Sequence, residues 1–333
     1  MAKVILVEPI HESGQKILRA AGLEPVVSPS TDTQTLVMQM DDDVFGIIVR
    51  TSKLEGSVLA AGKGLKIIGR HGIGYNNIDL ATAEQQNVLI CNVPDANSYS
   101  VAEHVLGAIL LLSRKLVQGD AALRGGKMNQ QGASLPGLVK KLNLGGNELP
   151  KQVLGIVGLG KIGMQVAHMA KTFFGMRVIG YDPYQKASDV PFEKVDELME
   201  LFNKADIVSL HTPATAQTEN MVNASVLANM KPTAYLINAA RGELIDELAL
   251  CGALTSGQIA GAVLDVFREE PPSLDNPLFS APNLLVTPHV AGATEEAVER
   301  LAIGAAQAVA DFYNGKRPAN IVNPKVWEQI QKT

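Results

Sequence analysis

The sequence predicts an α/β protein with two domains, each built on a doubly wound sheet of parallel strands. Short runs rich in Val, Ile and Leu alternate with longer amphipathic segments along most of the 333 residues, as in β-α-β units. These runs are apolar at nearly every position, which indicates strands buried on both faces. The chain is also long enough for two domains with separate cores.

The first alternating set occupies the N-terminal third of the chain. Strands are expected at residues 4–7, 25–27, 45–49, 66–68 and 88–91, with helices at 13–21, 33–40 and 80–86. A long helix over about 98–124 follows, with an apolar stripe that includes Val101, Val105 and Ile109. We place the crossover into the second domain at this helix.

The second alternating set follows a polar, glycine-spaced stretch that ends near Gly146. Strands are expected at 153–157, 177–181, 207–210, 234–238, 260–265 and 284–287, with helices at 162–172, 195–202 and 246–255. An Ala-rich closing helix over 294–313 is expected to return to the first domain, and the tail from Lys316 has little sheet or core signal. The expected domains are therefore 1–98 plus 295–333, and 99–294.

Composition narrows the function classes. The net charge is −5, from 29 basic and 34 acidic residues, which argues against a broad nucleic-acid-binding surface. Cys91 and Cys251 are the only cysteines, so we expect no disulfide framework and a cytoplasmic setting. The opening residues lack the pattern of a signal peptide, and the apolar run 108–112 is too short to cross a membrane. The histidines and cysteines lack metal-ligand spacing, so no metal is expected.

The most specific local motif is the glycine-rich turn Gly158-Leu-Gly160-Lys161-Ile162-Gly163. A strand precedes it, a helix follows it, and the next strand ends in Asp182, 19 residues after Gly163 (182 − 163). The three glycines allow the tight turn, the approach of a pyrophosphate and close helix packing, in that order. A ligand-free turn would need no such acid, so the motif favours a dinucleotide-binding (Rossmann) domain. Because Asp182 would repel a 2′-phosphate, we expect NAD rather than NADP.

Further motifs flank this turn. Upstream lie Val49-Arg50-Thr51, Gly69-Arg70-His71-Gly72-Ile73-Gly74 and Asn97–His104; downstream lie His211–Thr218, Leu236–Gly242, Leu264–Pro271 and Thr287–Thr294. In order and spacing the chain resembles the D-2-hydroxyacid dehydrogenase family, in its phosphoglycerate dehydrogenase-like branch, over nearly its whole length. The resemblance implies a flavodoxin-like substrate domain and a Rossmann NAD-binding domain.

The resemblance also implies a reaction: an oxidoreductase moves a hydride between nicotinamide and C2 of a D-2-hydroxy acid or 2-keto acid. His289 is the implied acid/base, Glu270 orients it and favours imidazolium, and Arg241 binds the substrate's carboxylate and carbonyl oxygens. Taken singly, Arg241 reads as a surface ion-pair residue, His289 as a loop histidine and Glu270 as part of a solvated loop. The family match aligns all three with the catalytic positions of the family.

The cofactor contacts are implied in the same way. Asp265 corresponds to the residue that holds the nicotinamide carboxamide; the alternative is a cap on the loop that follows its strand. His211, Thr212 and Pro213 correspond to the adenine-side wall, and Thr218 to a phosphate contact. Ala239 and Gly292 fall in motifs along the cofactor cleft.

The substrate contacts leave two alternatives open. Arg50 and Arg70 correspond to residues that hold the anionic end of the substrate, and the backbone amides of Ile73 and Gly74 would cradle its carboxylate. Together with His71, Lys53 and Lys140 they could bind a phosphate, as in a 3-phosphoglycerate-like substrate. A small unphosphorylated acid such as hydroxypyruvate or glyoxylate would need only some of them.

One segment departs from the family pattern. Gly126-Lys127-Met128 stands where relatives have Gly-x-Trp, and residues 132–143 form an insertion. In relatives this region lies near the active-site mouth and the dimer contact. The cofactor domains of relatives pair across a two-fold axis, so the resemblance implies a homodimer. An NAD(H)-sensing binding protein, resembling the corepressors on this scaffold, is the alternative to an enzyme. The lack of long disordered flanks and basic arms favours the enzyme.

Overall fold

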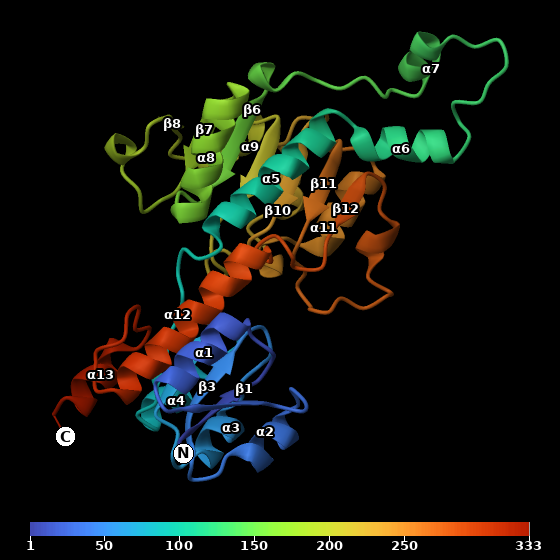
Figure 1. The fold of residues 1–333 in the computed structure, drawn as a ribbon. Coiled ribbons are helices and arrows are strands. Elements are labelled where there is room, and N and C mark those ends of the chain that lie inside the picture. Colours follow the sequence, from blue (N-terminus) through green and yellow to red (C-terminus); the bar gives the residue numbers. More distant parts are fainter. Residues whose placement is uncertain (333) are drawn as a thin grey trace. The chain divides into compact units, whose positions relative to one another are not determined.

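The computed structural model describes residues 1–332 and divides into two compact units. Unit 1 comprises Met1–Asn97 together with the chain from Ala293 onward, and unit 2 comprises Ser98–Gly292 (Figure 1). Two chain crossings therefore join the units, one before α5 (Ser98–Ser113) and one before α12 (Glu295–Tyr313).

Unit 1 contains a five-stranded parallel sheet. Its strand order is β2(Glu24–Val27), β1(Lys3–Leu6), β3(Val44–Val49), β4(Ile67–Arg70), β5(Leu89–Cys91). The order 2-1-3-4-5 is that of flavodoxin-like sheets, in which ligands bind beyond the carboxyl ends of the strands. The helices are α1(Glu12–Ala20), α2(Thr33–Gln39), α3(Gly56–Ala61), α4(Leu80–Gln85), α12 and α13(Pro324–Ile330).

Alternate residues of these strands face two separate cores. Val4 and Leu6 of β1 pack with α1, α12 and α13, whereas Ile5 packs with α2, α3 and α4. Burial on both faces explains why the strands read as continuous apolar runs. Figure 1 shows α12 alongside α1, and Gly14 makes this approach possible, because a Cβ there would lie 2.7 Å from the Ala302 carbonyl oxygen.

Unit 2 contains a seven-stranded parallel sheet. Its order is β12(Leu284–Val286), β11(Gly261–Leu264), β10(Tyr235–Asn238), β9(Ile207–Leu210), β6(Val153–Val157), β7(Arg177–Tyr181), β8(Glu193–Lys194). The first strand, β6, lies between β7 and β9, so the order reverses there, as in dinucleotide-binding sheets. The helices are α5, α6(Leu116–Arg124), α7(Leu135–Lys141), α8(Lys161–Phe174), α9(Leu198–Lys204), α10(Ala224–Ala228) and α11(Glu247–Thr255), with short 3-10 turns at Leu149–Lys151, Ala187–Asp189, Gly242–Leu244 and Pro277–Ser280.

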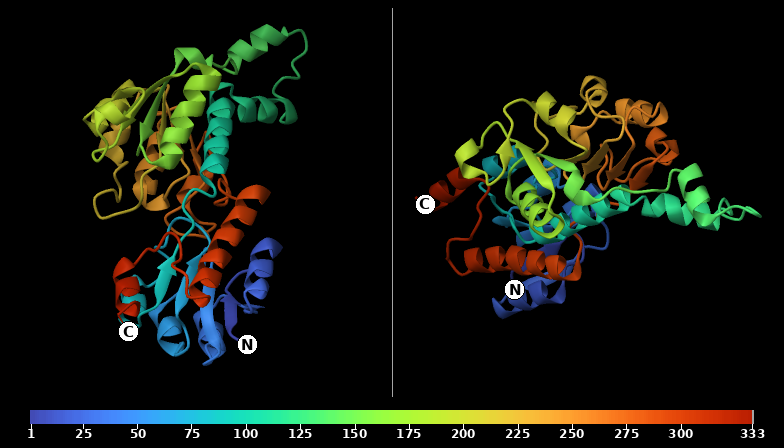
Figure 2. Two further views of the ribbon diagram at one scale, coloured as in Figure 1. Left: turned by 60° about the vertical axis from the view of Figure 1, so that its left-hand side comes forward. Right: turned by 90° about the horizontal axis from the view of Figure 1, so that it is seen from above.

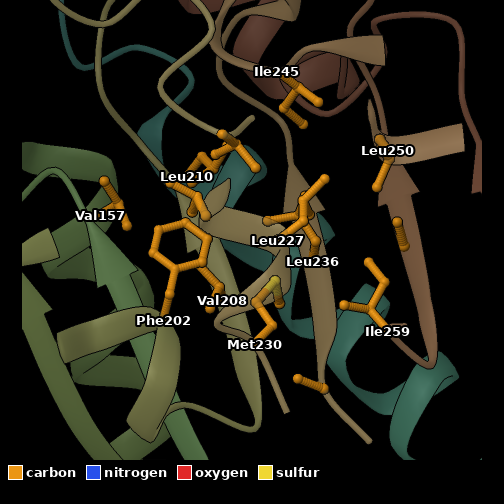
Figure 3. Packing of buried hydrophobic residues seen from close by; sticks show 14 of the residues in the cluster. Val157, Phe202, Val208, Leu210, Leu227, Met230, Leu236, Ile245, Leu250 and Ile259 are labelled. Atoms are coloured by element: carbon orange, nitrogen blue, oxygen red, sulfur yellow. The ribbon is translucent and has the colours of Figure 1, made fainter. Parts of the chain in front are cut away.

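The sheet of unit 2 is also covered on both faces. Helices α5 and α8 pack on one face, and α9, α10 and α11 pack on the other. Figure 3 shows the second core, where Phe202 of α9 lies against Val208 and Leu210 of β9. The two cores fix the strands whose carboxyl ends carry the candidate site.

Two local predictions were wrong. The long helix expected over 98–124 breaks, because α5 ends at Ser113 and Lys115 adopts a left-handed conformation with φ of 53° before α6. The tail after Lys316 was expected to add little to the core, yet α13 places Val326 in it with 1% exposure. The insertion contains α7, and Figures 1 and 2 show α6 and α7 extending away from the sheet of unit 2.

The described residues contain neither a membrane-spanning helix nor a cluster of metal-ligating side chains. No helix within residues 1–332 is long and apolar enough to cross a membrane. Within the same range, His, Cys, Asp and Glu side chains form no group of three or more that could hold a metal ion.

Candidate active site

The glycine-rich turn connects β6 to α8, and each glycine has a separate structural reason. Gly158 has φ of +93°, and a Cβ there would lie 2.6 Å from the His211 carbonyl oxygen. At Gly163 a Cβ would lie 2.1 Å from the Gly158 carbonyl oxygen, so only glycine lets α8 pack on the turn. Gly160, at the N-cap of α8, differs because a Cβ there would meet no atom within 4 Å. This open N-terminus of a 14-residue helix is suited to a pyrophosphate.

Asp182 lies beside this turn, directly after β7. Its Oδ2 accepts a hydrogen bond from the Leu159 N–H at 2.9 Å, and its Oδ1 accepts one from the Tyr184 N–H at 2.9 Å. Each carboxylate oxygen has a second lone pair. The half-exposed carboxylate can therefore accept ribose hydroxyls while its orientation stays fixed.

The residues expected along the adenine side follow β9. Burial lowers the pKa of His211 to about 4, so its imidazole is neutral at neutral pH, and its Nε2 lies 2.9 Å from the Ser209 Oγ. Thr212 and Pro213 continue from it, and the Thr218 hydroxyl donates to the Pro213 carbonyl oxygen at 2.7 Å. Thr218 thus closes the 213–218 loop, and its phosphate contact stays a prediction.

The three expected catalytic residues follow three neighbouring parallel strands. Arg241 comes after β10, Glu270 after β11 and His289 after β12, so all three loops start from the same edge of the sheet. His289 Nδ1 lies 2.7 Å from Glu270 Oε2. This hydrogen bond fixes the imidazole and leaves Nε2 for proton transfer.

The carboxylate of Glu270 is held in its ionised form. Burial raises its pKa, but the hydrogen bonds from His289 and from the Phe267 N–H, together with the charge of Arg241, outweigh burial and leave the pKa below its ordinary value. Glu270 is therefore an ionised, fixed hydrogen-bond partner of the His289 imidazole.

Two further residues, both within the Leu236–Gly242 motif, fix the loop that carries Arg241. Asn238 is 1% exposed at the end of β10; its Nδ2 donates to the Arg241 carbonyl oxygen at 2.8 Å and its Oδ1 accepts the Ala240 N–H at 3.0 Å. Gly242 is required next, because a Cβ there would lie 1.9 Å from the Phe267 carbonyl carbon. The Arg241 guanidinium donates to the Ala240 carbonyl oxygen at 2.6 Å.

Asp265 caps the loop that carries His289. The residue is 1% exposed. Its carboxylate accepts hydrogen bonds from the Thr287 hydroxyl at 2.5 Å, the Val290 N–H at 2.9 Å and the Ala291 N–H at 2.8 Å. The His289 N–H donates to the Asp265 carbonyl oxygen at 2.7 Å, and His289 has φ of +53°. This left-handed conformation is unfavourable for a residue with a side chain, and the contacts of Asp265 maintain it. The carboxamide contact expected of Asp265 stays a prediction, as do the contacts of Ala239 and Gly292.

In unit 1 the expected substrate residues follow β3 and β4. Arg50 comes directly after β3, Arg70 ends β4, and Ile73 and Gly74 lie in the turn that follows. The pKa of His71 is lowered to about 4. Burial is the largest cause, and the charges of the Arg50 and Arg70 guanidinium groups lower it further. The two arginines therefore create a positive potential at the carboxyl ends of β3 and β4 around a neutral imidazole.

The NAD-binding domain model of the D-isomer specific 2-hydroxyacid dehydrogenases matches residues 106–291. D-3-phosphoglycerate dehydrogenase of Methanocaldococcus jannaschii is 38% identical over 327 residues, which cover 97% of this chain and 60% of that protein. The human enzyme of the same name is 35% identical over 326 residues, covering 97% and 58%. The chain thus spans about 60% of the length of these curated relatives.

Solved structures of similar length align over both units. The TT0316 protein of Thermus thermophilus has a TM-score of 0.86 at 32% identity, covering 96% of this chain and 99% of that one. An NADPH-dependent glyoxylate/hydroxypyruvate reductase of Sinorhizobium meliloti, in complex with citrate, has a TM-score of 0.84 at 28% identity, covering 97% and 98%. The chain belongs to the D-isomer specific 2-hydroxyacid dehydrogenase family, and residues 106–291 match its NAD-binding domain.

Proposed function

We propose that the protein is an NAD-dependent oxidoreductase that interconverts a D-2-hydroxy acid and its 2-keto acid. The observation that carries this proposal is the 2.7 Å contact between His289 Nδ1 and Glu270 Oε2, with Arg241 on the neighbouring strand end. A proton donor and a cation at one sheet edge suit reduction of a carbonyl next to a carboxylate. Relatives named for dehydrogenase and reductase activities support the enzyme over an NAD(H)-sensing binding protein.

The residues of unit 2 suit a dinucleotide. The open N-terminus of α8 at Gly160 would hold the pyrophosphate, and Asp182 would hold the adenosine ribose. Bound NADH supplies the hydride for reduction, and NAD⁺ accepts it in the reverse direction. Arg241 would bind the substrate carboxylate and polarise its carbonyl oxygen. His289 Nε2 would then protonate that oxygen while Glu270 stabilises the imidazolium.

For the substrate we propose a small anionic 2-keto or 2-hydroxy acid, held by Arg50, Arg70 and the backbone of Ile73 and Gly74. Two candidates remain, because the relatives include D-3-phosphoglycerate dehydrogenases and a glyoxylate/hydroxypyruvate reductase. The positive potential around His71 suits either one, since both carry a carboxylate.

A panel of 2-keto acids with NADH tests this proposal. Glyoxylate, hydroxypyruvate and 3-phosphohydroxypyruvate are compared by the loss of NADH absorbance. A higher kcat/KM for the phosphorylated acid than for hydroxypyruvate would favour the phosphorylated substrate. A protein that binds NADH and reduces none of these acids would not be the proposed enzyme.

For the cofactor we propose a preference for NAD that depends on Asp182. In Asp182→Ala the repulsion of a 2′-phosphate is lost, so kcat/KM with NADPH should rise about tenfold relative to that with NADH. Asp189→Ala removes an exposed acid from the same segment and serves as the control. An unchanged ratio in Asp182→Ala would show that Asp182 does not set the preference.

We also propose that the protein forms a homodimer through α6 and α7. Leu116, Val117, Leu123 and Leu135 are 46–67% exposed, and a hollow of about 530 Å³ next to α7 is lined by Leu135, Pro136 and Val139 among others. A second copy would cover this apolar surface. Leu135→Glu should shift the mass measured by light scattering from dimer to monomer, whereas Leu274→Glu, at a 93% exposed leucine in another loop, should not. A monomeric wild-type protein would refute the proposal.

We place the protein in the cytoplasm. Cys91 and Cys251 are both free thiols, and Cys91 is buried in the core of unit 1. Such thiols suit a reducing compartment, and cell fractionation followed by immunoblotting would test the location.

A further inference from the structure

Glu8 lies just beyond the end of β1 and binds the loop that follows the neighbouring strand, β3. Its Oε2 accepts the Arg50 N–H at 2.8 Å, and its Oε1 accepts the Thr51 N–H at 2.9 Å and the Ser52 N–H at 2.7 Å. Three consecutive backbone amides thus donate to one carboxylate. Because hydrogen bonds to an ionised group are among the stronger ones in proteins, this contact rigidly fixes the loop.

The same loop is held from its other side by Asn77. Its Nδ2 donates to the Ser52 carbonyl oxygen at 2.8 Å and to the Arg50 carbonyl oxygen at 3.2 Å. The Leu54 N–H donates to the Asn77 carbonyl oxygen at 2.7 Å, which ties the two segments together. Glu8 therefore binds the amides of the loop, and Asn77 binds its carbonyl groups.

The Arg50 side chain is fixed from the same region. Its Nη1 donates to the carbonyl oxygen of Pro9, the residue after Glu8, at 3.2 Å. Among residues 1–332, no cation lies within ion-pair distance of Glu8 and no carboxylate within that distance of Arg50. The carboxylate of Glu8 therefore binds backbone N–H groups of the loop, and the guanidinium of Arg50 stays available to bind an anion.

We propose that Glu8 and Asn77 are positioning residues that hold Arg50 in the orientation that binds the anionic substrate. This inference rests on the proposed function, since it takes Arg50 as a substrate-binding residue. Neither residue needs to touch the substrate. Their effect should appear in substrate affinity rather than in the chemical step.

The first test is Glu8→Gln, which keeps the shape and removes the charge. Its amide nitrogen is a donor and would face the N–H donors of the loop, so the loop should shift. We expect KM for hydroxypyruvate to rise about tenfold while kcat stays within about twofold, with the Kd of NADH unchanged. Glu84→Gln, at an exposed glutamate of α4, makes the same charge change and should leave KM unaltered.

A second variant tests the inference even if Glu8→Gln folds poorly. Asn77→Ala acts on the same loop from a different segment and should raise KM about threefold. In an Arg50→Ala background, Glu8→Gln should add little further increase, because both changes remove one interaction. Fully additive effects on KM, or a lower kcat at unchanged KM, would overturn the inference.

Hydrogen exchange separates failure of this inference from failure of the proposed function. The amides of residues 50–52 should be protected in the wild-type protein and lose about tenfold or more of their protection in Glu8→Gln. Rapid exchange of these amides in an active wild-type protein overturns the inference and leaves the proposed function standing. A wild-type protein that binds NADH but reduces no keto acid overturns the proposed function and, with it, the role given to Arg50.

Discussion

The two units hold their functional loops by the same device. In unit 1 the carboxylate of Glu8, after β1, accepts backbone N–H groups of the loop after β3; in unit 2 Asp265, after β11, accepts those of the loop after β12. In each case the two strands are neighbours in a parallel sheet. The carboxyl ends of such strands meet at one edge, so a carboxylate on one loop reaches the amides of the next.

The two loops differ in how tightly they are constrained. Asp265 is 1% exposed and maintains a left-handed His289, whereas Glu8 is half-buried and serves a loop without positive φ. The left-handed conformation costs about 1–2 kcal/mol. Three hydrogen bonds to a charged acceptor, at about 1.5 kcal/mol each, exceed that cost. A residue that transfers a proton needs tighter placement than a long guanidinium that binds an anion.

The largest effect should follow removal of the proposed proton donor, His289. His289→Gln leaves the loop with no group able to protonate the substrate oxygen, so kcat for keto-acid reduction should fall by about 10³. The Kd of NADH, measured by fluorescence titration, should stay nearly unchanged.

His168→Gln is the matched control, because His168 is an exposed histidine of α8. It should retain full activity. Loss of NADH binding in His289→Gln would contradict the assignment of His289 as the acid/base.

The next effect should come from the carboxylate that holds His289. Asp265→Asn replaces one acceptor oxygen by a donor, so the 287–291 loop should relax and kcat should fall about 100-fold. Asp275→Asn, at an exposed aspartate, should have no effect.

A cofactor analogue distinguishes two roles for Asp265. The reduced 3-acetylpyridine analogue of NADH lacks the carboxamide N–H group. If Asp265 acts through His289, Asp265→Asn should lose the same factor with NADH and with the analogue. A much smaller loss with the analogue would show that Asp265 holds the carboxamide instead.

Local patterns in the sequence were sufficient to predict the two sheets and the glycine turn. Strands buried on both faces must be apolar throughout, and Gly158 and Gly163 are required by contacts within a few residues or with the adjacent strand. The pairing of His289 with Glu270 was predicted from a family resemblance. Taken alone, each of these residues reads as an ordinary loop residue.

The backbone contacts of the carboxylates could not be predicted from local sequence patterns, because the residues that they bind are distant along the chain. Glu8 and Arg50 are 42 positions apart, and nothing near Glu8 indicates its three acceptor contacts. Lys115 likewise has no glycine or proline beside it to mark the break between α5 and α6. The contacts of Glu8 depend on which strands become neighbours in the sheet, and no local pattern encodes that.

The smallest expected effect is on the pH dependence of stability. It concerns one histidine in each unit, and both differ from His289 in burial. Burial lowers the pKa of His71 in unit 1 and of His211 in unit 2 to about 4, below the ordinary value of 6.5. The unfolded chain therefore takes up protons first as the pH falls, so stability is lost from about pH 6.5 downward.

Between about pH 7 and about pH 5.5, each of these two histidines should lower the free energy of unfolding by about 1 kcal/mol. Urea unfolding at the two pH values should show this loss reduced by about half in His71→Gln and equally in His211→Gln. His168→Gln should keep the whole loss. An unchanged pH dependence in His71→Gln would show that the folded protein does not lower the pKa of His71.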